Sequence, residues 1–284
     1  MTDRARILLF LLVPLALVAG VVLAVRGTAF GMGNDYVLRV QLTAVDTAPP
    51  LPEVGGDGRL PLVVIDPGHG GHDPGASGEN VVEKRLVLAL AQTLRDTLER
   101  ENIARVALTR DDDRYLLHTE RYEIARRLNA DLFISIHADS AGESSEVTGA
   151  SVYTLSNDAS SEAARRFAER ENASDRLNGI EIGTTSDAVS DILVDLSQRR
   201  TQEESALFAS MIRRAGEGQI QFHPQARRSA ALKVLRAPDV PSVLFESGYI
   251  TNVDEAQRLS SEEGRTRFAE VMVRSIRSYF ARQR

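Results

Sequence analysis

The sequence predicts an α/β fold, in which a β-sheet is layered against helices. From residue 62 onward, short runs rich in β-branched residues alternate with longer segments whose apolar residues recur at helical spacing, and this alternation is typical of layered α/β domains. Gly, Asn, Pro or Ser flanks most of these segments, as expected where the chain reverses direction. We therefore expect strands over 62–66, 105–109, 132–136, 150–155, 232–236 and 242–246.

Amphipathic helices are expected between these strands. The clearest, 83–101, follows the first strand and has one apolar side. That side consists of Val87, Leu90, Ala91, Leu94 and Leu98. Further helices are expected over 119–128, 161–171, 203–216 and 263–282. The stretch 172–190 is rich in Gly, Ser, Thr and Asp, so we expect it to be irregular.

Composition limits the classes of function. The chain has 284 residues and 43% hydrophobic composition, which suffices for one substantial core. Its formal net charge of -6 argues against nucleic acid as a partner, because phosphate contacts need clustered Lys and Arg. The absence of cysteine excludes disulfides and thiolate metal ligands, so a zinc site would use histidine and carboxylate. The histidines are His69, His72, His118, His137 and His223.

The N-terminus predicts an address to the cell envelope. Residues 7–25 contain no charge and are flanked by arginines, which indicates a membrane-directed segment within 1–26. The apolar run is longer than that of a usual signal peptide, so we favour an uncleaved inner-membrane anchor over a cleaved signal peptide. Either reading exports the rest of the chain to the periplasm. Residues 27–60 are rich in Pro, Gly and acidic residues, which predicts a linker, although 36–42 could form one short strand.

Four side chains are expected to converge on one edge of the sheet. His69 lies in a Gly-rich segment directly after the first strand, where ligand sites of open α/β sheets collect. Glu83 begins the next helix, and His137 and Glu246 lie at the ends of two other apolar strands. Two histidines and one carboxylate suit catalytic zinc, and a carboxylate that does not bind the metal can transfer protons. Glu246 fits this last role.

Each of these residues also has a simpler interpretation. A single strand-end histidine such as His137 is most often a hydrogen-bonded structural residue. Glu83 in isolation suits a helix start, where the helix dipole favours a carboxylate. Glu246 is harder to dismiss, because burying an unpaired carboxylate costs on the order of several kcal/mol. The Gly-rich loop lacks the ending of a P-loop and the spacing of a dinucleotide-binding loop, so phosphate binding is not favoured.

Four sequence blocks follow one another in order. They are IDPGHGGHDPGA (65–76) with Glu83 downstream, LTRDDDRYLLHTER (108–121), DLFISIHAD (131–139) and VLRAPDVPSVLFESGYITN (234–252). With these blocks, residues 62–282 resemble the amidase-3 family of zinc-dependent N-acetylmuramoyl-L-alanine amidases. The resemblance implies a single α/β domain over 61–284 with a mixed, twisted sheet flanked by helices. It further implies that His69, Glu83 and His137 bind Zn²⁺ and that Glu246 is the catalytic carboxylate.

The reaction implied by the resemblance is hydrolysis of the amide between the lactyl group of N-acetylmuramic acid and L-alanine of the peptidoglycan stem peptide. Such enzymes work on the septal wall during daughter-cell separation. Two rival interpretations are a non-catalytic peptidoglycan-binding protein and a zinc carboxypeptidase that cuts elsewhere in the stem peptide. The intact set of candidate site residues counts against the first rival.

The resemblance also implies regulation by the inserted segment 156–197. In cell-division members, a helix from this insertion covers the zinc, a glutamate fills the open position, and an activator protein relieves the block. Glu171 is our candidate for this autoinhibitory ligand, with Glu169 as the alternate, and an ordinary amphipathic surface helix is the alternative interpretation. His72 stands where relatives often have Lys, Arg or Gln, and we do not expect it to be a ligand.

Overall fold

The computed structural model describes residues 49–142, 144, 146–177, 180–181 and 191–283. These residues belong to one compact unit, Ala48–Arg284. Within this part of the chain, no helix is long and apolar enough to span a membrane. The predicted anchor at 7–25 and the short strand at 36–42 lie outside the described residues.

A mixed six-stranded sheet forms the centre of the domain, with the strand order β2-β1-β3-β8-β4-β7. Its strands are β1 (Leu62–Pro67), β2 (Arg105–Leu108), β3 (Leu132–Asp139), β4 (Ala150–Leu155), β7 (Phe222–Ala230) and β8 (Ser242–Tyr249). β2, β1, β3 and β8 are parallel neighbours, whereas β4 runs antiparallel to β8 and β7 runs parallel to β4. The predicted α/β domain with a mixed sheet is confirmed.

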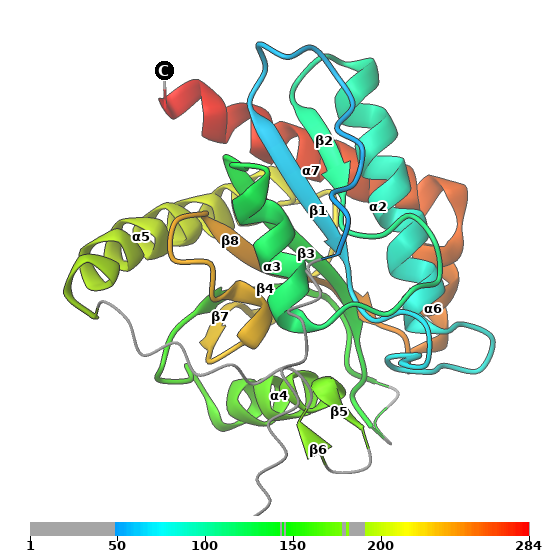
Figure 1. The fold of residues 1–284 in the computed structure, drawn as a ribbon. Coiled ribbons are helices and arrows are strands. Elements are labelled where there is room, and N and C mark those ends of the chain that lie inside the picture. Colours follow the sequence, from blue (N-terminus) through cyan, green and yellow to red (C-terminus); the bar gives the residue numbers. More distant parts are fainter. Residues whose placement is uncertain (1–48, 143, 145, 178–179, 182–190, 284) are drawn as a thin grey trace, which may run out of the picture. The chain divides into compact units, whose positions relative to one another are not determined.

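Helices cover both faces of this sheet, with α3 in front of it and α7 behind it in the view of Figure 1. One face packs against α2 (Glu83–Arg100), α5 (Asp191–Ala215), α6 (Val253–Ser260) and α7 (Glu262–Gln283). The other face packs against α3 (His118–Arg127), α4 (Glu162–Asn172) and the 3-10 turn η2 (Lys233–Leu235). Every residue of β1, β3 and β8 is consequently buried, which explains their apolar sequences.

The structure differs from the sequence-based prediction at the far edge of the sheet. The strand predicted at 232–236 is wrong, because this segment forms the turn η2, and the actual strand is β7. β7 contains a proline and several polar residues and is partly exposed, as befits an edge strand, so it lacks the apolar pattern that identified the others. Within 172–190, the structure describes the turn η1 (Ala173–Asp175) and two short paired strands, β5 (Arg176–Leu177) and β6 (Ile180–Glu181).

The end of the predicted linker packs on the domain. Gly55 and Val106 exchange two backbone hydrogen bonds, of 2.9 and 3.1 Å, so this segment adds to the edge of the sheet at β2. The guanidinium of Arg127 donates to the carbonyl of Pro49 at 2.8 Å. Pro49 and Gly55 of the predicted linker therefore contact the domain.

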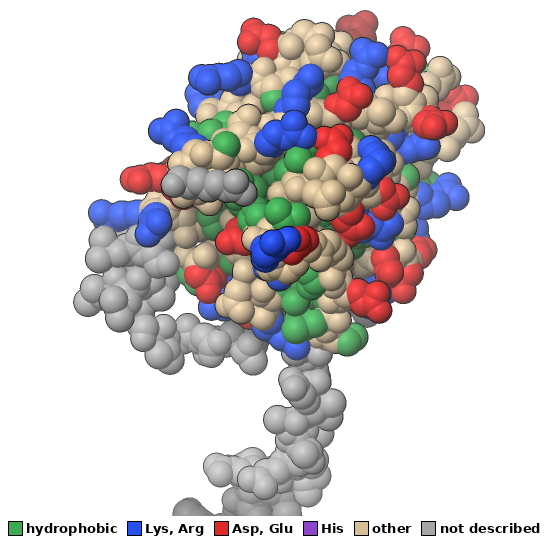
Figure 2. Space-filling model, turned by 90° about the horizontal axis from the view of Figure 1, so that it is seen from above, with side chains coloured by type: hydrophobic (Ala, Val, Ile, Leu, Met, Phe, Trp, Pro, Cys, Tyr) green, Lys and Arg blue, Asp and Glu red, His purple; other side chains and the backbone are tan. Residues whose placement is uncertain are grey.

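Charged side chains of both signs are interspersed over the face shown in Figure 2. On the helices, several charged side chains form pairs one turn apart, such as Arg165 with Glu162 and Arg267 with Glu263. Exposed pairs of this kind contribute at most about 1 kcal/mol each. The two apolar clusters that flank the sheet are therefore the main source of stability.

Candidate active site

The loop after β1 brings a histidine to the carboxyl edge of the sheet. His69 has a φ of 59°, a conformation that residues with side chains rarely adopt. A Cβ on the preceding residue, Gly68, would lie 2.4 Å from the ring of His137. The missing side chain of Gly68 therefore allows the two imidazole rings to approach to 4.7 Å between centroids.

A buried ion pair under the loop fixes its path. Arg121 on α3 contacts Oδ1 of Asp66 at 2.9 Å. The same guanidinium donates to the carbonyls of Pro67 at 2.9 Å and His69 at 2.7 Å. Burial alone would raise the pKa of Asp66, but the charge of Arg121 and bonds from two neighbouring hydroxyls outweigh it and lower the pKa. Asp66 thus stays ionised and holds Arg121 against the loop.

Arg110, two residues after the end of β2, supports the same loop. Its guanidinium donates to the carbonyls of Pro67 at 3.0 Å, Gly68 at 2.6 Å and Lys84 at 2.9 Å. Burial and repulsion by Arg121 lower the pKa of Arg110 to about 10, so it remains a cation at neutral pH. Two arginines of the block 108–121 therefore position the histidine loop, a role that the sequence analysis did not assign.

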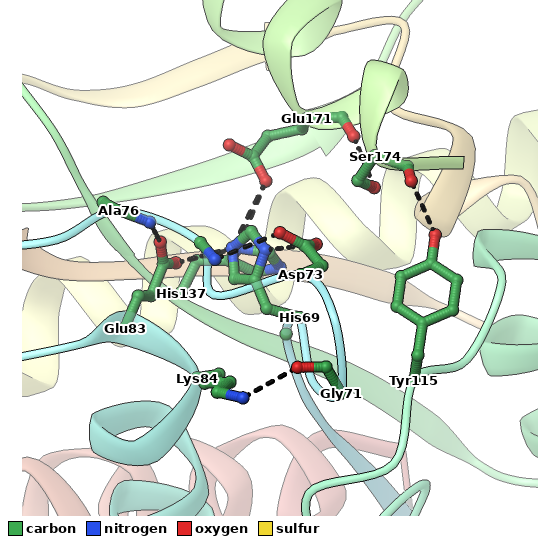
Figure 3. A network of polar contacts seen from close by, with 12 residues as sticks. His69, Gly71, Asp73, Ala76, Glu83, Lys84, Tyr115, His137, Glu171 and Ser174 are labelled. Carbon is green, nitrogen blue, oxygen red and sulfur yellow. Dashed lines mark hydrogen bonds and ion pairs between the residues drawn. The ribbon is translucent and has the colours of Figure 1, made fainter. Parts of the chain in front are cut away.

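Three of the predicted residues meet at one point (Figure 3). Oε1 of Glu83 lies 3.0 Å from Nε2 of His69 and 3.2 Å from Nδ1 of His137. His69 Nε2 is buried and makes no hydrogen bond in spite of this short distance. Ligand atoms around a four-coordinate zinc with bonds of about 2.0 to 2.1 Å are about 3.4 Å apart. The donor set and its spacing therefore fit a zinc ion.

The carboxylate of Glu83 is fixed by main-chain donors. Its Oε2 accepts from the amide of Ala76 at 2.7 Å, and its Oε1 accepts from the amide of Ala138 at 2.9 Å. Burial would raise the pKa of Glu83, but His69 and His137 outweigh it and lower the pKa. Conversely, burial would lower the pKa of His69, but Glu83 and a second carboxylate raise it well above the usual value. The raised pKa favours the protonated form of His69. A metal that binds this ring must displace the added proton, so the metal affinity falls at low pH.

Asp73 supplies that second carboxylate. Its Oδ2 lies 2.8 Å from Nδ1 of His69, and its Oδ1 accepts from the amide of Gly75. The contact favours a proton on Nδ1 and leaves Nε2 directed at Glu83. Carboxylates commonly orient metal-binding histidines in this way. Asp73 lies in the predicted loop, but its role depends on the turn that brings it back to His69.

Glu171 reaches the same point from α4. Its Oε2 lies 3.4 Å from Nδ1 of His137 and 3.7 Å from Nε2 of His69. These two histidines and Glu171 form a group whose potential ligand atoms all lie within 4.8 Å of one another. The Glu171 side chain is only 9% exposed, whereas that of Glu169 is 60% exposed and pairs with Arg165. The structure thus places Glu171, and not Glu169, at the site.

Glu246 lies beside this group on β8. It is paired in register with His137, so the two side chains project from the same face of neighbouring strands. It is fully buried, and neither carboxylate oxygen has a hydrogen-bond partner. Burial first, then the charges of Asp139, Glu83 and Glu171, raise the pKa of Glu246 well above its usual value. A carboxyl that is buried, unpaired and close to the candidate metal ligands is a candidate for proton transfer.

Two further charged residues border the site. Arg170, next to Glu171, contacts Oδ1 of Asp139 at 2.5 Å. Burial raises the pKa of Asp139 to about 6 although Arg170 opposes this effect. His72 lies apart, with its ring centroid 4.3 Å from that of Tyr115. Neither Asp139 nor Arg170 stood out in the sequence, because their importance comes from contact with α4.

The site therefore has the composition of a metal-dependent hydrolase, with two histidines, a fixed carboxylate and a separate buried carboxyl. Comparison with known proteins gives the family. The Amidase_3 model, described as N-acetylmuramoyl-L-alanine amidase, matches residues 63–278. N-acetylmuramoyl-L-alanine amidase AmiA of Escherichia coli (strain K12) is 36% identical over 255 residues, which cover 89% of this chain and 87% of that protein.

Two further relatives agree. N-acetylmuramoyl-L-alanine amidase AmiC of Escherichia coli O6:H1 is 36% identical over 235 residues, which cover 82% of this chain and 56% of that protein. The solved structure of N-acetylmuramoyl-L-alanine amidase AmiC2 of Nostoc punctiforme has a TM-score of 0.55 and 30% identity. That match covers 81% of this chain and 100% of the solved one.

The chain belongs to the Amidase_3 family of N-acetylmuramoyl-L-alanine amidases. Its reaction is hydrolysis of the amide that joins N-acetylmuramic acid to L-alanine in peptidoglycan. The resemblance noted in the sequence and the enzyme class it implied are confirmed. The interpretations as a non-catalytic binding protein or a carboxypeptidase are thereby disfavoured.

Changing Gly68 should damage the site without unfolding the domain. In Gly68→Ala, the new methyl group would displace the His137 ring, so we expect zinc affinity to fall about 10- to 100-fold, as it does when a supporting contact is lost. Zinc affinity can be measured by competition with a chelating dye. The matched control is Gly58→Ala, because a Cβ at Gly58 would meet nothing within 4 Å. Equal zinc affinity in the two variants would contradict this account of the loop.

Proposed function

We propose that this amidase is zinc-dependent, that His69, Glu83 and His137 hold the zinc, and that Glu246 is the catalytic carboxylate. The main support is that a nitrogen of each imidazole lies within 3.2 Å of the same Glu83 oxygen at the sheet edge. When bound, zinc polarises the scissile carbonyl and lowers the pKa of a bound water to about 7.

Glu246 is suited to move the proton in this reaction. Its position beside His137 lets it take a proton from the attacking water and pass it to the amine of L-alanine as the amide breaks. The raised pKa of Glu246 favours its return to the protonated form, from which it can deliver the proton to the leaving amine. Glu83 cannot do the same, because two main-chain amides and two histidines hold it as a carboxylate.

We further propose that α4 is autoinhibitory and that Glu171 blocks the open metal position. The Glu171 carboxylate lies within 3.7 Å of both histidine nitrogens, where a substrate carbonyl would otherwise bind. A lid of this kind would restrict an enzyme whose polymeric substrate is always close by. An activator protein that draws α4 away would start the reaction.

The contacts around Glu171 hold it in the blocking position. On one side, Arg170 pairs with Asp139. On the other side, Asn172 donates to the carbonyl of Ala231 and accepts from the amide of Lys233, both at 2.8 Å. These contacts tie the end of α4 to two different parts of the domain.

The turn η1 adds a third attachment through Asp175. Its Oδ1 lies 2.8 Å from Nδ1 of His118 and accepts from the hydroxyl of Tyr115 at 3.0 Å and the amide of His118 at 3.2 Å. Burial opposes ionisation, but His118 outweighs it and lowers the pKa of Asp175. The charged carboxylate therefore binds the turn to the start of α3.

For its setting, we propose that 1–26 anchors the enzyme to the inner membrane and that 27–60 links this anchor to the catalytic domain. The catalytic domain would then act in the periplasm on septal peptidoglycan during daughter-cell separation. The uncharged run 7–25 with flanking arginines supports the anchor over a cleaved signal peptide.

Digestion of purified sacculi tests the catalytic assignments. With zinc present, Glu171→Ala should release intact stem peptides faster than wild type, because the metal position is open. Adding Glu246→Gln should reduce release about 10²- to 10⁴-fold, the usual contribution of a general acid-base group. Mass spectrometry identifies the products, and zinc content shows that the metal site survives. Undiminished release by the double variant would remove Glu246 from the mechanism.

The attachment through Asp175 should control basal activity. Asp175→Ala removes three contacts of η1. If this destabilises the closed state by about 1 to 2 kcal/mol, the population of open enzyme rises about 5- to 30-fold. We expect a matching rise in dye-labelled fragments released from sacculi. Asp158→Ala, an exposed aspartate before α4, is the control and should behave like wild type. If Asp175→Ala also matches wild type while Glu171→Ala is activated, the turn does not hold the lid.

A further inference from the structure

A line of side chains extends from Glu246 across the sheet to β7. Glu246 is in register with Ser151 of β4, and Tyr153, two residues further along β4, is in register with Arg228 of β7. Residues two apart on a strand, and register partners on neighbouring strands, project from the same face. Arg228 therefore lies on the same face as the proposed catalytic carboxylate.

Arg228 is a buried cation whose partners are neutral. It is 8% exposed, and its guanidinium donates to the hydroxyl of Tyr153 at 2.9 Å and to Nδ1 of His223 at 2.8 Å. Burial and the charge of Arg228 lower the pKa of His223, which keeps this ring uncharged. The carbonyl of Gln225 and the side chain of Tyr249 are its further partners, and both are neutral. No carboxylate among the described residues forms an ion pair with Arg228.

The other buried arginines have evident structural tasks. Arg121 pairs with Asp66, and Arg110 donates to four backbone carbonyls. Arg228 instead lies between two aromatic side chains with its charge uncompensated, which is costly unless a ligand offsets it.

The lid covers this region. The ring of Phe167 on α4 stacks on that of Tyr153, with centroids 4.4 Å apart and planes at 25°. Ser160, just before α4, exchanges two hydrogen bonds with Ser229, the neighbour of Arg228. Withdrawal of α4 would therefore uncover Tyr153 and Arg228 together with the metal site.

We propose that Arg228, with Tyr153, forms a subsite that binds a carboxylate of the stem peptide and that α4 masks it in the closed enzyme. Glu246 and Arg228 are two strands apart across the sheet and two residues apart along the strand direction. These two displacements put their Cα atoms about 12 Å apart. An extended peptide covers this distance in about three residues. The ligand is therefore a carboxylate two or three residues from the scissile amide.

This inference rests on the proposed function, because it takes the stem peptide as ligand and α4 as a removable cover. The test uses the full chain with Glu171→Ala and Asp175→Ala together as the parent, so that the blocking carboxylate and an attachment of α4 are both removed. The substrates are two soluble muropeptides that differ only in whether the carboxylates of the second and third stem residues are free or amidated. Dissociation constants and kcat/KM are measured for both.

We expect the parent to bind and cut the free-carboxylate muropeptide at least about tenfold better than the amidated one, as a charge-assisted contact requires. Adding Arg228→Gln should abolish this preference by weakening only the free-carboxylate substrate. Arg227→Gln removes the same charge from an exposed neighbour on β7 and should keep the preference. Arg228→Lys should keep part of it.

If the parent showed equal dissociation constants and equal kcat/KM for the two muropeptides, the subsite would be overturned, even if Arg228→Gln failed to fold. An unchanged preference in a folded Arg228→Gln would overturn it as well. If the parent cut neither muropeptide but still bound the free one more tightly, the catalytic assignments would fail and the subsite would stand.

Discussion

The contact of one Glu83 oxygen with both His69 and His137 is the constraint on which the site depends. It requires three elements to meet, namely the loop after β1, the start of α2 and the end of β3. Much of the surrounding structure holds these elements together. Arg110 and Arg121 fix the loop carbonyls, and main-chain amides fix the carboxylate. Only a glycine at Gly68 lets the loop approach His137.

The same edge of the sheet gathers an unusual amount of negative charge. Besides burial, the charges of Asp139, Glu83 and Glu171 raise the pKa of Glu246, and the charge of Glu171 also raises the pKa of Asp139. Carboxylates this close and this buried favour either protonation or a bound cation. Zinc and the guanidinium of Arg170 would meet this need in the closed enzyme. Withdrawal of α4 would remove both Glu171 and Arg170, so the proposed lid would change the electrostatics of the site as well as access to it.

The sequence predicted the parts of the site that depend on strand ends. His69, His137 and Glu246 follow or end apolar strands, and parallel strands bring such residues to one edge. It could not predict β7, because an edge strand with polar residues lacks an apolar pattern. The roles of Asp73, Arg121 and Arg170 were also missed, since they arise from tertiary contacts between distant segments. Glu171 was named only through the family resemblance, and its contacts at the site depend on how α4 packs.

X-ray absorption at the zinc edge of the purified protein tests the central claim most directly. The account predicts bound zinc with about four nitrogen and oxygen neighbours at about 2.0 to 2.2 Å and an imidazole signal from two histidines. Combined replacement of His69 and His137 by Ala should remove that signal. A protein that binds no zinc, or a zinc spectrum unchanged by the double replacement, would contradict the proposed metal centre.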